Sequence, residues 1–145
     1  MSVKIELRQE TGYRFAIRFG EGMPVVHSDL GPPLGSASGP SPEHLLAAAV
    51  GNCLASSLLF SLKKFKQSPE PIAAVATAVE GRNENNRLRV LAINVTLTLG
   101  VPAAKLDNLE RVLATFEDFC TVTASVRGAI AVEVEVFDSE GKKLK

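Results

Sequence analysis

The residues best suited to chemistry are two cysteines, Cys53 and Cys120, and two histidines, His27 and His44. The cysteines lie far apart in the sequence, so neither a CxxC redox motif nor the close ligand spacing of a zinc site is present. Two scattered histidines are too few for a metal site, and we expect none. Two thiols can still do redox chemistry, because a thiolate that attacks a peroxide becomes a sulfenic acid, which a second thiol converts to a disulfide.

Cys53 lies at the centre of the most apolar segment of the chain, an uncharged run from Leu45 to Leu62. The run is just long enough for a transmembrane helix. However, Gly51, Asn52 and several serines dilute it, and the flanking segments alternate polar and apolar residues as soluble strands do. We therefore expect a buried core helix and no membrane contact. A helix that is apolar on nearly all sides must be covered by protein on all sides, which is difficult for one small domain.

Gly51 and Asn52, directly before the cysteine, suit a helix interior poorly. They could interrupt the helix, or let it restart with Asn52 as the N-cap. A restart would place the Cys53 sulfur beside unpaired backbone amides and the positive end of a helix dipole, which stabilise a thiolate. The alternative interpretation is an inert core thiol, since free cysteine is among the most buried residue types. A Cys/His hydrolase built on either histidine has no motif to support it.

The segments around this helix alternate apolar and polar residues and predict β-strands. We expect a hairpin with an arginine-bearing polar face over residues 3–19, a short strand at 24–27, a second hairpin over 72–99 and a last strand at 130–136. The order of strands, central helix, strands, helix and strand predicts an α+β fold.

Helix signals place the central helix and one later helix. The central helix should begin at Ser41 or Pro42, with Ser41 as N-cap, after the loop "DLGPPLGSASGPSP", and should end near Lys66. A second helix should open at Pro102. Its apolar residues follow helical spacing and lead to Cys120, at or just past the end of the core-facing stripe.

Length and charge exclude several classes of function. The 145 residues fit one domain, residues 1–145. Sixteen basic residues balance sixteen acidic ones and are scattered along the chain, so no basic patch for nucleic acid or an anionic membrane is present. The partner is then a small molecule or another copy of the chain. The segment "MSVKIELRQE" is charged and lacks the apolar core of a signal peptide, so we expect a cytoplasmic protein, in which a structural disulfide is disfavoured.

Two segments resemble a known family. "GPSPEHLLAAAVGNC", with Glu43 in the first helical turn and Cys53 ten positions later, resembles the central-helix signature of the OsmC/Ohr family of thiol-dependent peroxidases. "FEDFCTVTASVRGAIAVEVEV" is similar to that family's second-cysteine segment and last strand, with Cys120 at the position of the resolving cysteine. The order of elements matches over almost the whole chain.

The resemblance implies an OsmC-like fold, with antiparallel sheets wrapped around a long central apolar helix in an intertwined homodimer that has two sites at its subunit interface. Cys53 would be the peroxidatic thiolate that reduces small apolar hydroperoxides to alcohols. Cys120 would resolve its sulfenic acid by forming a Cys53–Cys120 disulfide. An external dithiol, lipoyl-type in the Ohr branch, would reduce that disulfide, so no bound cofactor is expected.

The resemblance also implies an N-terminal arginine that steadies the thiolate and is held by Glu43. Arg8, Arg14 and Arg18 compete for this role, and we choose Arg18, on the polar face of the second strand. An unbroken helix would place Glu43 about 15 Å from Cys53 and roughly 80° away around the axis. They could then share an arginine only if the helix bends, or if the arginine and glutamate reach the thiol through a folded-back segment or from the other subunit.

Two other functions stay open on the sequence. The loop before the central helix lacks the motifs of the Ohr branch, so the chain is more similar to an OsmC-like branch. It could be a thiol redox sensor or carrier that is oxidised without rapid turnover. It could also be a non-catalytic binder of small apolar ligands that uses the same apolar cavity.

Overall fold

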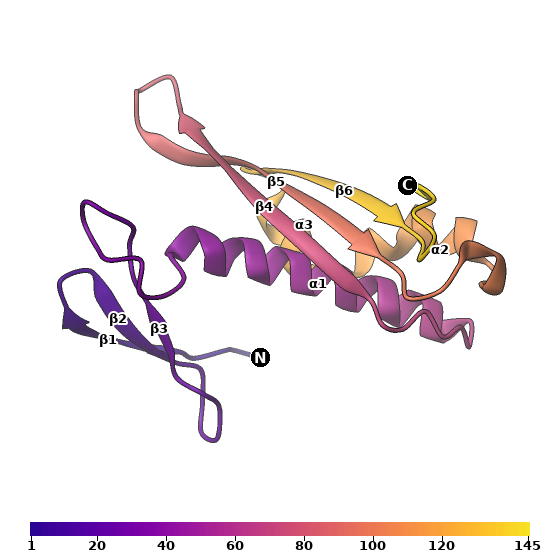
Figure 1. Ribbon diagram of the computed structural model, residues 1–145, viewed down its shortest axis with the longest axis horizontal. Coiled ribbons are helices and arrows are strands. Elements are labelled where there is room, and N and C mark those ends of the chain that lie inside the picture. The colour runs from indigo at the N-terminus through magenta and orange to yellow at the C-terminus, as the bar shows by residue number, and fades with distance from the viewer. The chain divides into compact units, whose positions relative to one another are not determined.

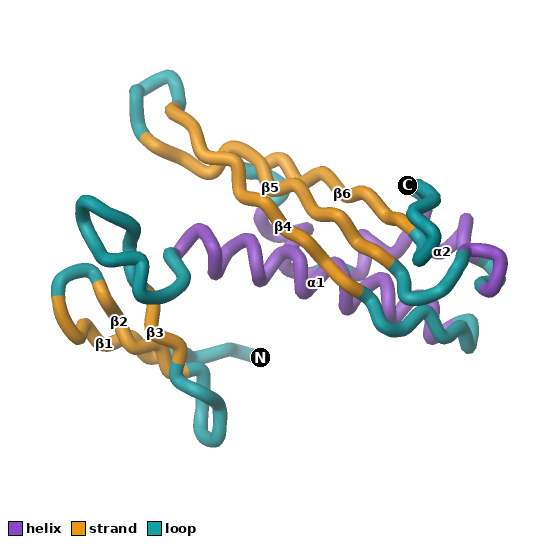
Figure 2. Tube along the Cα trace, viewed as in Figure 1, coloured by secondary structure: helices purple, strands orange, loops and turns teal.

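The computed structural model describes residues 1–145, which form two compact units, residues 1–46 and 47–145. The first unit contains the strands β1 (Glu6–Thr11), β2 (Arg14–Arg18) and β3 (Val26–Ser28). The long helix α1 (Pro42–Lys64) begins in the first unit and continues through the second (Figure 1). The second unit also holds the elements β4 (Ala73–Arg82), β5 (Leu88–Thr98), η1 (Ala103–Lys105), α2 (Leu109–Thr115), η2 (Phe116–Phe119), α3 (Thr121–Val126) and β6 (Ala131–Phe137), where η denotes a short 3₁₀ helix. This α+β composition confirms the predicted fold class (Figure 2).

The N-terminal unit is built on an antiparallel sheet in the order β1-β2-β3. The predicted hairpin is confirmed, although its first strand starts at Glu6 instead of residue 3. Arg8, Ala16 and His27 are paired across the three strands, so their side chains share one face. Arg18 lies two residues from Ala16 and belongs to the same face. The arginine-bearing polar face is therefore confirmed.

The loop that follows β3 is ordered by one buried carboxylate, Asp29, which is 3% exposed. Asp29 accepts hydrogen bonds from the backbone amide and hydroxyl of Ser36, at 3.0 and 2.8 Å, and from those of Ser38, at 3.2 and 2.9 Å. The bonds from Ser36 and Ser38 lower the pKa of Asp29 from its ordinary value of 3.8, because they stabilise the ionised form. The Gly/Pro/Ser segment thus has no regular secondary structure but a specific fold.

We expect Asp29→Asn to destabilise the protein at neutral pH, because the amide cannot accept all four hydrogen bonds. The pKa is lower in the folded chain, so the carboxylate stabilises the fold fully above the ordinary value of 3.8, and this contribution is lost as the pH falls below that value. Urea unfolding followed by circular dichroism should therefore show a large difference from wild type at about pH 7 and a smaller one at about pH 3. Asp107→Asn, at an exposed carboxylate, is the control, and an equal difference at both pH values would contradict this role.

The sheet of the second unit has the order β4-β5-β6. β4 and β5 form the predicted antiparallel hairpin, but β5 and β6 are parallel, so the expectation of purely antiparallel sheets is wrong for this pair. The reason is the connection. Between β5 and β6 the chain passes through η1, α2, η2 and α3, and such a crossover returns the chain to the starting edge of the sheet, so that the next strand runs in the same direction.

The core of this unit lies between one face of the sheet and α1. From Ile93 onwards every second residue of β5 is buried, and these residues pair with alanines of β4 and valines of β6 on the same face. α1 contributes a buried stripe to the same core. The buried apolar side chains of β5 and its end are Ile93, Val95, Leu97 and Leu99, and those of α1 are Ala47, Val50, Leu54, Leu58 and Leu62.

α1 begins and ends close to the predicted residues. Ser41 precedes it, and the Ser41 hydroxyl accepts a 3.5 Å hydrogen bond from the backbone amide of His44. The last turn ends at Lys64, and Lys66 then adopts a left-handed conformation that stops the helix. α1 is long and apolar enough to cross a membrane by length and composition. Its buried stripe instead packs against the sheet, as predicted for the core helix of a soluble protein.

The second predicted helix, from Pro102, is wrong as a single element. The segment forms η1, then α2 from Leu109, then η2. Asn108 adopts a left-handed conformation with φ of 58°, which breaks the helix between η1 and α2. The apolar spacing still describes burial correctly, because Leu113 and Phe116 are buried. The short helix α3, which starts directly after Cys120, was not predicted.

Candidate active site

The structure brings the two cysteines together in the second unit. Cys53 lies in the middle of α1 and is half-buried, whereas Cys120 lies between η2 and α3 and is 0% exposed. Both thiols are free, and their side chains lie close enough for Cys53 to raise the pKa of Cys120. Residues far apart in the sequence thus form a dithiol pair in which Cys53 is partly exposed and Cys120 is enclosed.

Gly51 and Asn52 do not interrupt the helix, so of the alternatives left open by the sequence, a break or restart of α1 beside Cys53 is wrong. α1 itself therefore supplies no unpaired amides of a helix start beside the Cys53 thiol. Gly51 is buried, and a Cβ atom at this position would lie 3.1 Å from the Cβ atom of Ala76 on β4. The glycine serves close packing of the helix on the sheet, with small residues on both sides.

The Cys120 thiol is enclosed by protein on all sides. Its sulfur lies 2.9 Å from the hydroxyl oxygen of Thr123, one turn further along in α3, and Thr123 is also 0% exposed. Burial raises the pKa of Cys120 above its ordinary value, and the neighbouring Cys53 thiol raises it further, while the hydrogen bond with Thr123 opposes the change. Cys120 is accordingly held as a neutral thiol.

The segment that carries Cys120 is fixed on both sides by side-chain contacts. Phe119 packs edge-to-face on Phe60 of α1, with 6.0 Å between ring centroids. The Lys64 ammonium lies 4.6 Å from both centroids. Glu117 forms ion pairs with Arg127, at the end of α3, and with Lys145. These contacts hold the Cys120 sulfur against α1.

Glu43 lies in the first turn of α1, as predicted, ten residues before Cys53 along an unbroken helix. The Ser41 hydroxyl and the backbone amide of Glu43 itself lower the pKa of its carboxyl. No ion pair joins Glu43 to an arginine of the same chain. The helix is continuous from Glu43 to Cys53, and ten residues of α-helix span about 15 Å along the axis.

The three candidate arginines differ in what they contact. Arg14 donates to Glu10 at 2.9 Å and to Ser38 at 3.0 Å, so it is already engaged within the N-terminal unit. Arg18, at the end of β2, is exposed and forms no ion pair or hydrogen bond with another side chain. Arg8 is likewise exposed and forms none. Of the three, Arg14 is therefore the least free to serve another site.

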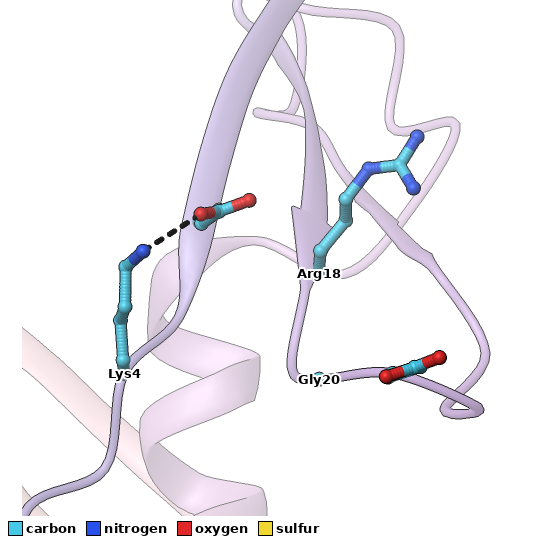
Figure 3. Close-up of a pocket in the computed structure, with 5 residues that line it drawn as sticks. Lys4, Arg18 and Gly20 are labelled. Carbon is cyan, nitrogen blue, oxygen red and sulfur yellow. Dashed lines mark hydrogen bonds and ion pairs between the residues drawn. The ribbon is translucent and has the colours of Figure 1, made fainter.

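Arg18 lines a polar pocket of about 320 Å³ in the N-terminal unit. Lys4 and Glu6 on the same pocket form an ion pair of 2.9 Å. Figure 3 shows the Arg18 side chain extending away from Lys4, with its guanidinium free. No group of three histidine, cysteine, aspartate or glutamate side chains is placed to hold a metal ion.

Sequence reasoning missed Thr123 and the pair formed by Phe60 and Phe119. Thr123 could have been found, because a polar side chain three residues after the start of a helix faces the residue that begins it. Phe60 lies seven residues after Cys53, which places it on the same face of α1. Its contact with Phe119 depends on a long-range approach that no local pattern contains.

Comparison with known proteins identifies the family. The model of the family described as OsmC-like protein matches residues 35–135, which include both cysteines and Glu43. The chain belongs to the OsmC-like family. No protein in the curated set matches the sequence significantly.

Solved structures share the OsmC-like fold at low sequence identity. An OsmC-like protein of unknown function from Vibrio cholerae is 16% identical, with a TM-score of 0.78 and coverage of 94% of this chain and 99% of that chain. The organic hydroperoxide resistance protein OsmC from Legionella pneumophila is 14% identical, with a TM-score of 0.74 and coverage of 95% and 97%. The organic hydroperoxide resistance protein OhrB of Bacillus subtilis is 16% identical, with a TM-score of 0.71 and coverage of 94% and 98%. At these identities the similarity establishes the fold.

Proposed function

We propose that this OsmC-like protein is a cysteine-based peroxidase that reduces organic hydroperoxides to alcohols. The observation that carries the proposal is the dithiol pair: a half-buried Cys53 in contact with a fully buried Cys120. A peroxidatic thiol must be reachable by its substrate, whereas a resolving thiol needs only to reach the first sulfur. The names of two structural relatives, both organic hydroperoxide resistance proteins, support the same class of substrate.

The reaction has three steps. The Cys53 thiolate attacks the distal oxygen of ROOH, the O–O bond breaks, and the departing RO⁻ takes up a proton to become ROH. Cys53 is left as a sulfenic acid, which Cys120 converts to a disulfide with loss of water. An external dithiol then reduces the disulfide by thiol–disulfide exchange. We assign this last role to a lipoyl-type dithiol, as the resemblance to the Ohr branch implies. The reductant is external, so the reaction requires no cofactor bound to the chain.

We assign Glu43 and Arg18 to the stabilisation of the Cys53 thiolate, acting from a second copy of the chain. The separation along α1 prevents Glu43 from reaching the thiol of its own helix. A guanidinium free of other partners, such as that of Arg18, is available to pair with both a carboxylate and a thiolate. The proposal therefore requires a homodimer.

The exposed side of α1 supports such a homodimer. Ala48, Asn52, Ser56 and Phe60 recur every four residues and form an exposed stripe on a helix that is apolar on most sides. Small side chains in such a stripe allow another helix to approach closely. The charge balance gives no reason to add a nucleic-acid or membrane partner. The proposed location is the cytoplasm, where a dithiol reductant is available.

The test is steady-state consumption of hydroperoxides by the reduced protein. A panel of alkyl, aryl and lipid hydroperoxides should be combined with dihydrolipoamide, thioredoxin or glutathione as reductant. We expect sustained turnover of an organic hydroperoxide with a dithiol. Oxidation of Cys53 without turnover would instead indicate a redox sensor or carrier. A protein whose Cys53 stays reduced would be a non-catalytic binder, and the proposed function would be wrong.

A further inference from the structure

The Thr123 hydroxyl is placed to act on the buried Cys120 thiol. The two side chains are 2.9 Å apart, and both residues have no solvent exposure. A threonine hydroxyl has one donor hydrogen and two acceptor lone pairs, so it can accept a hydrogen bond from a thiol or donate one to a thiolate. Both hydrogen bonds are direct, with no bridging water between the Thr123 hydroxyl and the Cys120 sulfur.

The local fold fixes this contact. Cys120 directly precedes α3, and Thr123 lies in the first turn of that helix, where the three-residue spacing places the two side chains on the same side. η2, on the other side of Cys120, is held to α1 by the contact of Phe119 with Phe60. The Cys120 side chain thus has both Cys53 of α1 and Thr123 of α3 as neighbours.

We propose that Thr123 is a positioning residue for the resolving step, which stabilises the Cys120 thiolate while it attacks the Cys53 sulfenic acid. The inference rests on the proposed peroxidase function. At rest the Thr123 hydroxyl accepts the hydrogen bond of the Cys120 thiol. When the thiol loses its proton, the same hydroxyl rotates and donates to the thiolate, beside the backbone amide of Thr123, which also favours the ionised form.

The step balances without an additional oxidant. The Cys120 thiolate forms the S–S bond with Cys53, the S–O bond of the sulfenic acid breaks, and the departing hydroxide takes up the proton lost by Cys120 to leave as water. The oxidising equivalents come from the hydroperoxide that oxidised Cys53.

The environment explains why such help is needed. Burial and the Cys53 thiol raise the pKa of Cys120, so little thiolate is present at neutral pH. Cys53, on α1, is the titratable group that faces the Cys120 sulfur, and Thr123, on α3, is the polar one. Loss of the hydroxyl leaves only the backbone amide of Thr123 to oppose the influences of burial and of Cys53 that disfavour the thiolate.

The test compares Thr123→Val, which keeps the shape and removes the hydroxyl, with Thr123→Ser, which keeps the hydroxyl. The reduced full-length proteins are mixed with one equivalent of cumene hydroperoxide. Sulfenic acid, trapped with dimedone, and disulfide are then followed over time across a range of pH. We expect all three proteins to form the Cys53 sulfenic acid at the same rate. Disulfide formation should be at least tenfold slower in Thr123→Val, with its pH midpoint shifted upwards, and close to wild type in Thr123→Ser.

A second measurement is independent of peroxide. In the Cys53→Ser variant Cys120 is the only thiol, and its thiolate absorbance can be titrated in this variant and in the double variant Cys53→Ser/Thr123→Val. The midpoint should be higher in the double variant, and circular dichroism verifies that both variants are folded. Unchanged resolution kinetics and an unchanged midpoint in Thr123→Val would overturn the role of Thr123 alone. If hydroperoxide leaves Cys53 of the wild type reduced, both this inference and the proposed function are wrong.

Discussion

Replacing Cys53 with serine is expected to reduce hydroperoxide consumption to the uncatalysed background. A serine hydroxyl at neutral pH is a far weaker nucleophile than a thiolate, and it cannot form the sulfenic acid on which the later steps depend. α1 should be unaffected, because Cys53 is only half-buried and the replacement is nearly the same size. Residual hydroperoxide, measured after incubation with protein and excess dithiol, should match a blank without protein.

Cys120→Ser separates the two thiols and is the matched comparison. This variant should consume one equivalent of hydroperoxide per chain and then stall, because the Cys53 sulfenic acid has no internal thiol to react with. Dimedone should trap the sulfenic acid at Cys53. Oxidation of Cys120 by hydroperoxide in the Cys53→Ser variant would reverse the assignment of the two roles.

The second large effect concerns Glu43 and Arg18. The two residues are expected to stabilise the Cys53 thiolate as one unit. Glu43→Gln and Arg18→Ala should therefore each lower the peroxidase rate roughly 30- to 1,000-fold. This factor corresponds to the roughly 2–4 kcal/mol that preorganised electrostatic groups often contribute to a barrier. The neutral amide cannot reproduce the paired, charge-assisted hydrogen bonds of a carboxylate to a guanidinium. The double variant should be barely slower than either single variant, since both changes remove one unit.

The structure supplies a control for this comparison of the single and double variants. Arg14 is engaged by Glu10 and Ser38, so Arg14→Ala should disturb the N-terminal sheet and its loop more than the rate per folded molecule. Additive losses in the double variant would rule out Arg18 as the partner of Glu43 and leave Arg8 as the free candidate. Wild-type rates in Glu43→Gln would mean that the carboxylate only favours the start of α1, a contribution of roughly 0.3–1 kcal/mol.

Strands and the start of the long helix could be predicted because their signals are local. The alternation of Leu91, Ile93, Val95 and Leu97 matches the two-residue repeat of a strand, and the residues of this run that face the core, from Ile93 onwards, are buried. Ser41 and Pro42 lie where a helix start requires them. The position of Cys120, just past an apolar stripe, followed from the same spacing.

The errors arose where tertiary packing decided the outcome. A break of α1 at Gly51 was one of the alternatives left open by the sequence, but the residue permits close contact with Ala76, which is far away in the sequence. The helix expected from Pro102 is broken at Asn108, whose left-handed conformation no apolar pattern indicates. The parallel pairing of β5 and β6 follows from the crossover through the short helical elements η1, α2, η2 and α3. The contact of Thr123 with Cys120 depends on α3, which the sequence did not predict.

The most direct test of the central claim is the state of the two cysteines after oxidation. The fully reduced protein is treated with one equivalent of an alkyl hydroperoxide, alkylated without reducing agent, digested and analysed by mass spectrometry. We predict a loss of two hydrogen atoms per chain and a cross-linked peptide pair that joins Cys53 to Cys120 within one chain, with one equivalent of alcohol released. Alkylation of both cysteines, or a disulfide between two chains in place of the internal one, would contradict the account.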